Sequence, residues 1–285
     1  RLSEALLVRE ADGRPRRLLD IVRTTINTDD GADSNTRMFA LLGDPTLRIG
    51  LPTRTVRLTS VNGQPVSEGA PPELRALERT EVEGEVLTAA GPVDAAFEGE
   101  VEVTVFDAAR RVAVPEEAQR FQAGGEFEVR SDRLFQGRAS VSQGRFRVAF
   151  VVPRDESYSG APARIAVYAR SATLDGAGAT EDVVISTTAG AGSSDTAGPR
   201  MTLRFATEAD LSGEPSSDEV PQASFVDGGL VGPEPTLVVR LEDETGINTV
   251  GSGVGHQLLL SLDGDAAGAI DIGSSFEGDL NDASS

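Results

Sequence analysis

Short stretches of strictly alternating residues, separated by turn-forming residues, constrain the fold of this chain more than any other feature. Residues 100–106 place Val101, Val103 and Val105 between polar neighbours, and residues 145–152 alternate Phe, Val and Phe with Arg and Ala. A period of two is the pattern of a β-strand with one buried and one solvated face. Because Gly, Pro and Asp turns separate these stretches and no helical pattern intervenes, the sequence predicts antiparallel β-sandwiches.

The expected strands lie between residues 55 and 262, and the residues before and after this range lack the same alternation. They are residues 55–61, 78–87, 100–106, 145–152, 163–169, 182–186, 201–205, 236–241 and 257–262. Apolar residues at helical spacing predict a helix within residues 1–22. A buried run at 38–42 ends in the turn Gly43-Asp44-Pro45, after which a short strand is expected at 47–49.

Changes in composition suggest the domain boundaries. Residues 1–52 form a helical segment of their own, and residues 53–186 form a first β-sandwich domain. Residues 187–198 are a Gly/Ala/Ser/Thr linker, and residues 199–285 form a second β-sandwich domain. The second domain is expected to be incomplete, and both chain ends are expected to be cut. Arg1 falls inside an element, no signal peptide precedes it, and Ser285 ends a polar run.

Composition excludes several classes of function. The 285 residues contain no Cys and one His, so the chain has no disulfide, no thiolate nucleophile and no site built from two imidazoles. The net charge of −20 disfavours nucleic acid and anionic lipid as partners. No stretch approaches the roughly 20 apolar residues of a membrane span, so direct membrane insertion is not expected.

The single histidine, His256, lies in a Gly-rich run, with Gly251, Gly253 and Gly255 before it. It could act as a metal ligand or general base, but the sequence nominates no partner for it, which favours a structural role in a turn. The glycines do not form a nucleotide loop, because a strand-like Leu run follows them where a helix is required.

Asp263, Asp265 and Asp271 resemble the start of a calcium loop, although the distal Glu and the Gly position do not fit. Asp263-Gly264 is more simply a hairpin turn. No spacing selects a pair of acids for glycosidase chemistry. We therefore predict no catalytic, cofactor-binding or metal-ligating residue and no cofactor, leaving a structural calcium ion in an oxygen-rich loop as an open alternative.

Several segments in order resemble one protein family. They are NTRMFALLGDPTLRI at 35–49, LFQGRASV at 134–141, GRF at 144–146, FVVPRD at 150–155, YA at 168–169, DGAG at 175–178, DTAGP at 195–199, DETGIN at 243–248 and GVGH at 253–256. In this order the chain resembles the region that follows the catalytic domain of PorU-type sortases of the type IX secretion system. These are gingipain-like cysteine peptidases that remove C-terminal signals from secreted cargo.

The resemblance implies a mainly β chain of two immunoglobulin-like β-sandwich domains, preceded by a short helical remnant of an α/β peptidase domain. It places the catalytic His and Cys upstream, so no residue here inherits a catalytic role. It further implies a spacer or docking platform at the outer-membrane surface, with an outer-membrane β-barrel and secreted cargo proteins as partners. The alternative is a surface adhesin or ligand-binding β-sandwich module without a protease.

Overall fold

The computed structural model describes residues 8–10, 14–28, 41–67, 70–114, 125–130, 132–153, 160–186, 198–206, 229–243, 247 and 258–281. The chain divides into two compact units, Arg1–Thr53 and Arg54–Ser285. Within the described residues the structure is mainly β, as the alternating sequence predicts, with one α-helix and many strands.

The first unit contains the helix α2, Leu18–Thr28. Ile21 is its buried residue, with 1% of its surface exposed. The helix begins where Leu18 N donates to Leu47 O at 2.9 Å, next to an isolated bridge between Arg17 and Arg48. The helix therefore continues beyond the end of the helical pattern of residues 1–22, and residues 1–7 and 11–13 of that pattern lie outside the described residues. The expected strand at 47–49 is reduced to that single bridge at Arg48.

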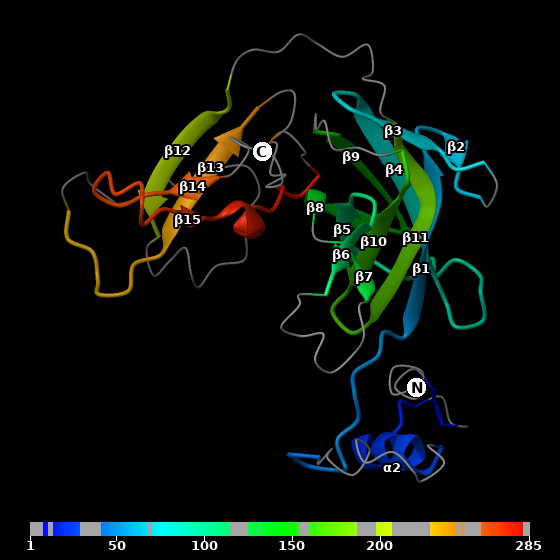
Figure 1. Ribbon diagram of the computed structural model, residues 1–285. Helices are drawn as coiled ribbons and strands as arrows, with labels where there is room; N and C mark the ends of the chain where they lie inside the picture. The colour runs from blue at the N-terminus through cyan, green and yellow to red at the C-terminus, as the bar shows by residue number, and fades with distance from the viewer. Residues whose placement is uncertain are drawn as a thin grey trace. The chain divides into compact units, whose positions relative to one another are not determined.

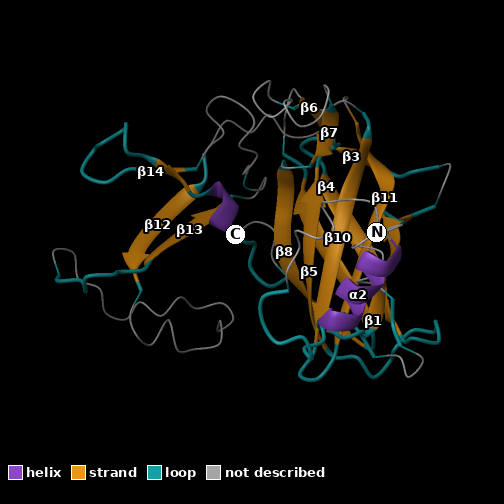
Figure 2. Cartoon of the chain, turned by 60° about the horizontal axis from the view of Figure 1, so that its bottom comes forward, coloured by secondary structure: helices purple, strands orange, loops and turns teal. Residues whose placement is uncertain are grey.

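Seven strands of the second unit form a closed, barrel-like ring, which Figures 1 and 2 show as a bundle of long strands. Their order around the ring is β1 (Arg54–Val61), β4 (Arg79–Leu87), β9 (Arg145–Val151), β8 (Arg133–Ser142), β5 (Gly99–Phe106), β10 (Pro162–Arg170) and β11 (Asp175–Ser186). The short strands β2 (Gln64–Pro65) and β3 (Glu73–Arg75) extend it beside β1 and β11.

The ring has long ladders on its two sides and short ones where the sides meet. β4 and β9 pair over seven residues, whereas β8 and β9 pair only through Val141 and Ser142. β1 and β11 pair in parallel at Arg54 and Thr55 alone. The expected immunoglobulin-like sandwich is not confirmed, because these two short ladders join the strands into one ring.

The core of the ring consists of the inward residues of every strand, mostly Val, Leu, Ile, Ala and Phe. Phe135 and Phe150 stack inside it with ring centroids 4.4 Å apart and planes at 10°. They come from β8 and β9, so their rings meet just where those two backbones have stopped pairing. Gly137 makes room for them, since a Cβ there would lie 2.4 Å from the Phe135 ring.

Three further two-stranded sheets occur outside the ring in the part of the chain that the structure describes. They are β6 (Arg110–Ala113) with β7 (Glu126–Val129), β12 (Arg200–Phe205) with β13 (Leu237–Glu242), and β14 (Leu259–Leu260) with β15 (Ile270–Asp271). A short 3-10 helix, η2 (Gly273–Ser275), follows β15. Apart from Gly198, the predicted linker at 187–198 lies outside the described residues, so the further boundary proposed there stays a prediction.

Candidate interaction surface

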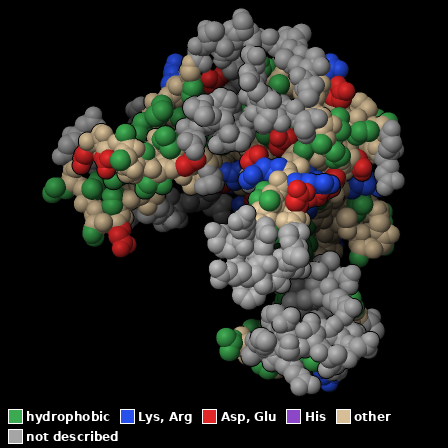
Figure 3. Space-filling model, viewed as in Figure 1, with side chains coloured by type: hydrophobic (Ala, Val, Ile, Leu, Met, Phe, Trp, Pro, Cys, Tyr) green, Lys and Arg blue, Asp and Glu red, His purple; other side chains and the backbone are tan. Residues whose placement is uncertain are grey.

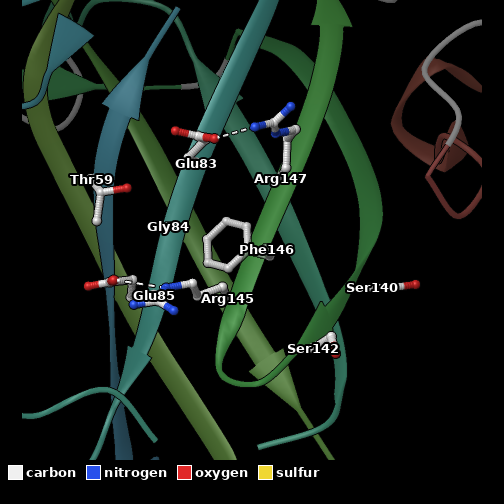
Figure 4. A pocket seen from close by; sticks show the side chains of 9 residues that line it. All are labelled: Thr59, Glu83, Gly84, Glu85, Ser140, Ser142, Arg145, Phe146 and Arg147. Atoms are coloured by element: carbon white, nitrogen blue, oxygen red, sulfur yellow. Dashed lines mark hydrogen bonds and ion pairs between the residues drawn. The ribbon is translucent and has the colours of Figure 1, made fainter. Parts of the chain in front are cut away.

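The outer face of β1, β4 and β9 carries a shallow hollow of about 600 Å³. Its lining, drawn in Figure 4, is Thr59, Glu83, Gly84, Glu85, Ser140, Ser142, Arg145, Phe146 and Arg147. The register pairs Glu83 with Arg147 and Glu85 with Arg145 across two neighbouring strands. Side chains directly opposite on one face of a sheet interact most strongly, so opposite charges line up here as a ladder.

The ladder consists of ion pairs in which the arginines are exposed and the glutamates are partly buried. Glu83 contacts Arg147 at 2.7 Å, and Glu85 lies between Arg145 at 3.3 Å and Arg57 at 3.0 Å. Figure 4 shows the first two of these contacts as dashed lines. In Figure 3, acidic and basic side chains likewise lie intermixed on the visible face of the chain. The face is nearly neutral even though the whole chain carries −20.

A β-bulge positions one further contact in this ladder. The register between β1 and β4 shifts between Leu58 and Ser60, which leaves Thr59 as the extra residue. Such a bulge re-aims the side chains beyond it. As a result, the Ser60 hydroxyl donates to Glu83 Oε2 at 2.7 Å.

The Ser60 hydroxyl is the main cause of a lowered pKa at Glu83, and Arg147 lowers it further. The same pair raises the pKa of the Arg147 guanidinium, chiefly through its hydrogen bond to Glu83. Arg147 is exposed and Glu83 only partly buried, so solvent screens and weakens this interaction.

Replacing Glu83 by glutamine is expected to lower the free energy of unfolding slightly at pH 7, with the loss shrinking as the pH falls. Glu83 has a folded pKa below its ordinary value of 4.5, so its contribution is complete above pH 4.5 and disappears as the pH falls through the folded pKa. Urea unfolding of wild type and Glu83→Gln between pH 7 and pH 3 measures this. Glu234→Gln, on an exposed loop, is the control. A Glu83→Gln loss that stays constant over this range would contradict the assignment.

The hollow offers binding contacts and no catalytic pair. Its three hydroxyls, on Thr59, Ser140 and Ser142, have no general base within hydrogen-bonding distance among the described residues, and Ser140 Oγ accepts a hydrogen bond from Asn281 Nδ2 at 2.9 Å. A nucleophilic hydroxyl needs a base within hydrogen-bonding reach. The hollow therefore presents charged and hydroxyl side chains.

The residues that the sequence singled out are distributed away from this hollow. Asp263 and Gly264 have positive φ angles of 52° and 76°, which confirms the predicted turn. Asp265 Oδ1 accepts backbone hydrogen bonds from Ala267 at 3.0 Å and Gly268 at 3.2 Å. Asp271 Oδ1 accepts one from Gly273 at 2.9 Å. These carboxylates stabilise their own loops, and a calcium ion there stays a prediction.

Two other predicted features meet different outcomes. Asp44 forms a turn as expected: its side chain accepts hydrogen bonds from the Thr46 hydroxyl at 2.7 Å and the Thr46 N–H at 2.8 Å. These bonds, the hydroxyl first, lower the pKa of Asp44. His256 and the glycines before it lie outside the described residues, so their structural role stays a prediction. Among the described residues, no helix is both long and apolar enough to cross a membrane.

Comparisons with known proteins bear on the whole chain. No protein-family model matches it, and no curated protein matches it. Over 97% of its length it is similar to the crystal structure of dimeric latent PorU from Porphyromonas gingivalis, with 28% identity and a TM-score of 0.50. The chain resembles PorU. This supports the relationship that the sequence segments indicate, and the chain spans 25% of the PorU chain.

A second solved structure, the sporulation control protein Spo0M from Bacillus subtilis, is much less similar. It shares 9% identity over 47% of this chain and 50% of its own, with a TM-score of 0.28. That similarity carries no argument about fold or function, so PorU is the relative on which the functional reasoning rests.

Proposed function

We propose that this chain is the non-catalytic β-domain portion of a gingipain-like cysteine endopeptidase, a type IX secretion sortase that removes C-terminal signals from secreted cargo. The observation that carries the proposal is the similarity to PorU along 97% of the chain at 28% identity. The chain contains no Cys, so a cysteine peptidase of this kind must supply its nucleophile from residues outside these 285.

In this proposal the chain is a spacer and docking platform. A closed ring of strands with an apolar core suits such a role, because closure removes most of the strand edges that would otherwise pair with other chains. The outer face of paired Arg and Glu side chains provides polar contacts for a partner. We place the protein on the outer-membrane surface, with the β-barrel of the secretion system and secreted cargo as partners.

Capture of that outer-membrane β-barrel tests the proposal. The whole chain and residues 53–285 are each immobilised and exposed to detergent-solubilised outer membranes of the source organism. We expect both to retain the β-barrel, while an unrelated β protein of equal net charge does not. If the chain does not retain the β-barrel while circular dichroism confirms its β structure, the docking role is contradicted.

The alternative of an adhesin or ligand-binding module predicts other results. Calcium often orders the loops of such domains, and an ion that binds only the folded state raises its stability. A calcium-dependent rise in Tm, together with no capture of the β-barrel, would favour this alternative. The absence of Trp and the presence of only two Tyr argue against sugar binding by aromatic stacking.

A further inference from the structure

One edge of β8 is left open by the ring. β8 pairs with β5 from Arg133 to Val141, but with β9 only at Val141 and Ser142. The backbone groups on the β9 side of residues 133–140 therefore have no strand of the ring to pair with. An open edge of this kind is a template for an additional strand.

A segment from the end of the described chain occupies this edge. We call residues 273–281 the strap. Gly278 forms a parallel bridge with Gly137, and its N–H donates to Gln136 O at 2.9 Å. Asn281 N–H donates to Arg138 O at 2.9 Å. The Asn281 side chain accepts a hydrogen bond from Ser140 N at 2.8 Å. The strap thus adds to β8 mainly through main-chain hydrogen bonds, as in β-augmentation.

The charge of Arg138 determines which side chains a segment bound at this edge can carry. Arg138 Nε lies 2.6 Å from Glu277 Oε1, its Nη1 lies 3.9 Å from Glu100 Oε2, and only 19% of the Arg138 side chain is exposed. This contact is an ion pair and not a hydrogen bond, since the buried Nε has no hydrogen-bond partner among the described residues, and its charge favours an acidic residue at this position. Gly278, next in the strap, is buried beside β8. The edge therefore fits an extended peptide that places an acidic residue beside Arg138.

The strap is attached shallowly. Glu277, Asp279, Leu280 and Asn281 are exposed, and no strap residue belongs to the described hydrophobic core. Segments that bury little apolar surface open at low free-energy cost. We propose that the β8 edge is a strand-accepting site for an extended acidic peptide of a partner, and that the strap is its displaceable occupant. This inference stands on these contacts and does not depend on the relationship to a protease.

Peptide binding to a variant with a weakened strap tests this. The full chain with Glu277→Ala and Asn281→Ala is titrated with a fluorescein-labelled peptide of residues 273–281, followed by anisotropy. We expect this variant to bind the peptide at least about tenfold more tightly than wild type, because the intact strap competes at high effective concentration. Equal affinity for both proteins would overturn the proposal.

Exchanging the charges of Arg138 and Glu277 tests whether the peptide binds at the β8 edge. Adding Arg138→Glu to the weakened variant is expected to reduce peptide affinity by about tenfold, and a peptide carrying Glu277→Arg is expected to restore it. Arg164→Glu on β10, which β5 separates from β8, is the matched control and should leave binding unchanged. Binding insensitive to Arg138→Glu would contradict the site. A weakened variant that dimerises through its own strap and takes up no peptide would assign the edge to a second copy and overturn the proposal.

Hydrogen exchange on the wild-type chain tests displaceability without any variant. The amides of Gly278 and Asn281 are expected to exchange at least about tenfold faster than amides of the β5–β8 ladder, such as that of Val103. Protection of the strap equal to that of the ladder would show a permanent strand and overturn the proposal.

Discussion

Replacing Gly178 by valine is expected to destabilise the ring by at least about 3 kcal/mol, because it blocks the corner where β11 meets β1. A Cβ at Gly178 would lie 1.8 Å from the Val56 carbonyl oxygen and 2.8 Å from its carbon. Both are backbone atoms of β1, so no side-chain rotation relieves the contact and the strands must separate. The parallel ladder beside it has only two residue pairs, which leaves little to hold the corner together.

Urea unfolding followed by circular dichroism measures this effect. Gly232→Ala is the control, since a Cβ there meets no atom within 4 Å and φ is not positive. The control is expected to change the free energy of unfolding by less than about 0.5 kcal/mol. A Gly178→Val protein as stable as the control would contradict the closed ring.

Replacing Phe150 by alanine is expected to lower the free energy of unfolding by about 3–5 kcal/mol. Phe150 is 1% exposed and stacks on Phe135 at 4.4 Å. The pair joins β8 and β9 where their backbones no longer pair, so the loss includes a cavity at the weakest part of the sheet. Denaturant unfolding of the full chain measures it.

Two further variants separate the contribution of ring stacking to stability from the contribution of side-chain volume. Phe150→Leu keeps most of the volume and is expected to cost less than the alanine change. The Phe135→Ala/Phe150→Ala double variant is expected to lose less than the sum of the single variants, because the two rings share one contact. Additive losses, or a Phe150→Ala loss under about 1 kcal/mol, would show that the stack does not hold this corner.

The sequence predicts seven strands, β1, β4, β5, β9, β10, β12 and β13, to within one residue at each end. β5 and β9 match their expected ranges to within one residue at each end, because Val or Phe marks every inward position. β8 was missed because Gly137 and Ala139 interrupt its inward row. The first half of β11 was missed because Gly176 and Gly178, which permit the close approach to β1, read as a loop.

Closure of the ring could not be predicted from alternation. Alternation with a period of two residues indicates which residues are buried. The choice of neighbouring strand depends on contacts between residues far apart in the sequence. The parallel β1–β11 pairing and the strap on β8 are formed largely by backbone groups, which leave no side-chain pattern. The ladder of Glu83 and Glu85 with Arg147 and Arg145 was visible only as alternating charge, since its meaning depends on the β4–β9 register.

Sequencing the gene several hundred codons upstream of Arg1 tests the central claim most directly. The relationship to PorU predicts an open reading frame that continues upstream into an α/β domain with a His and then a Cys at strand ends. A start codon and signal peptide immediately before Arg1 would contradict it, and the adhesin-like binding module would then be the better interpretation.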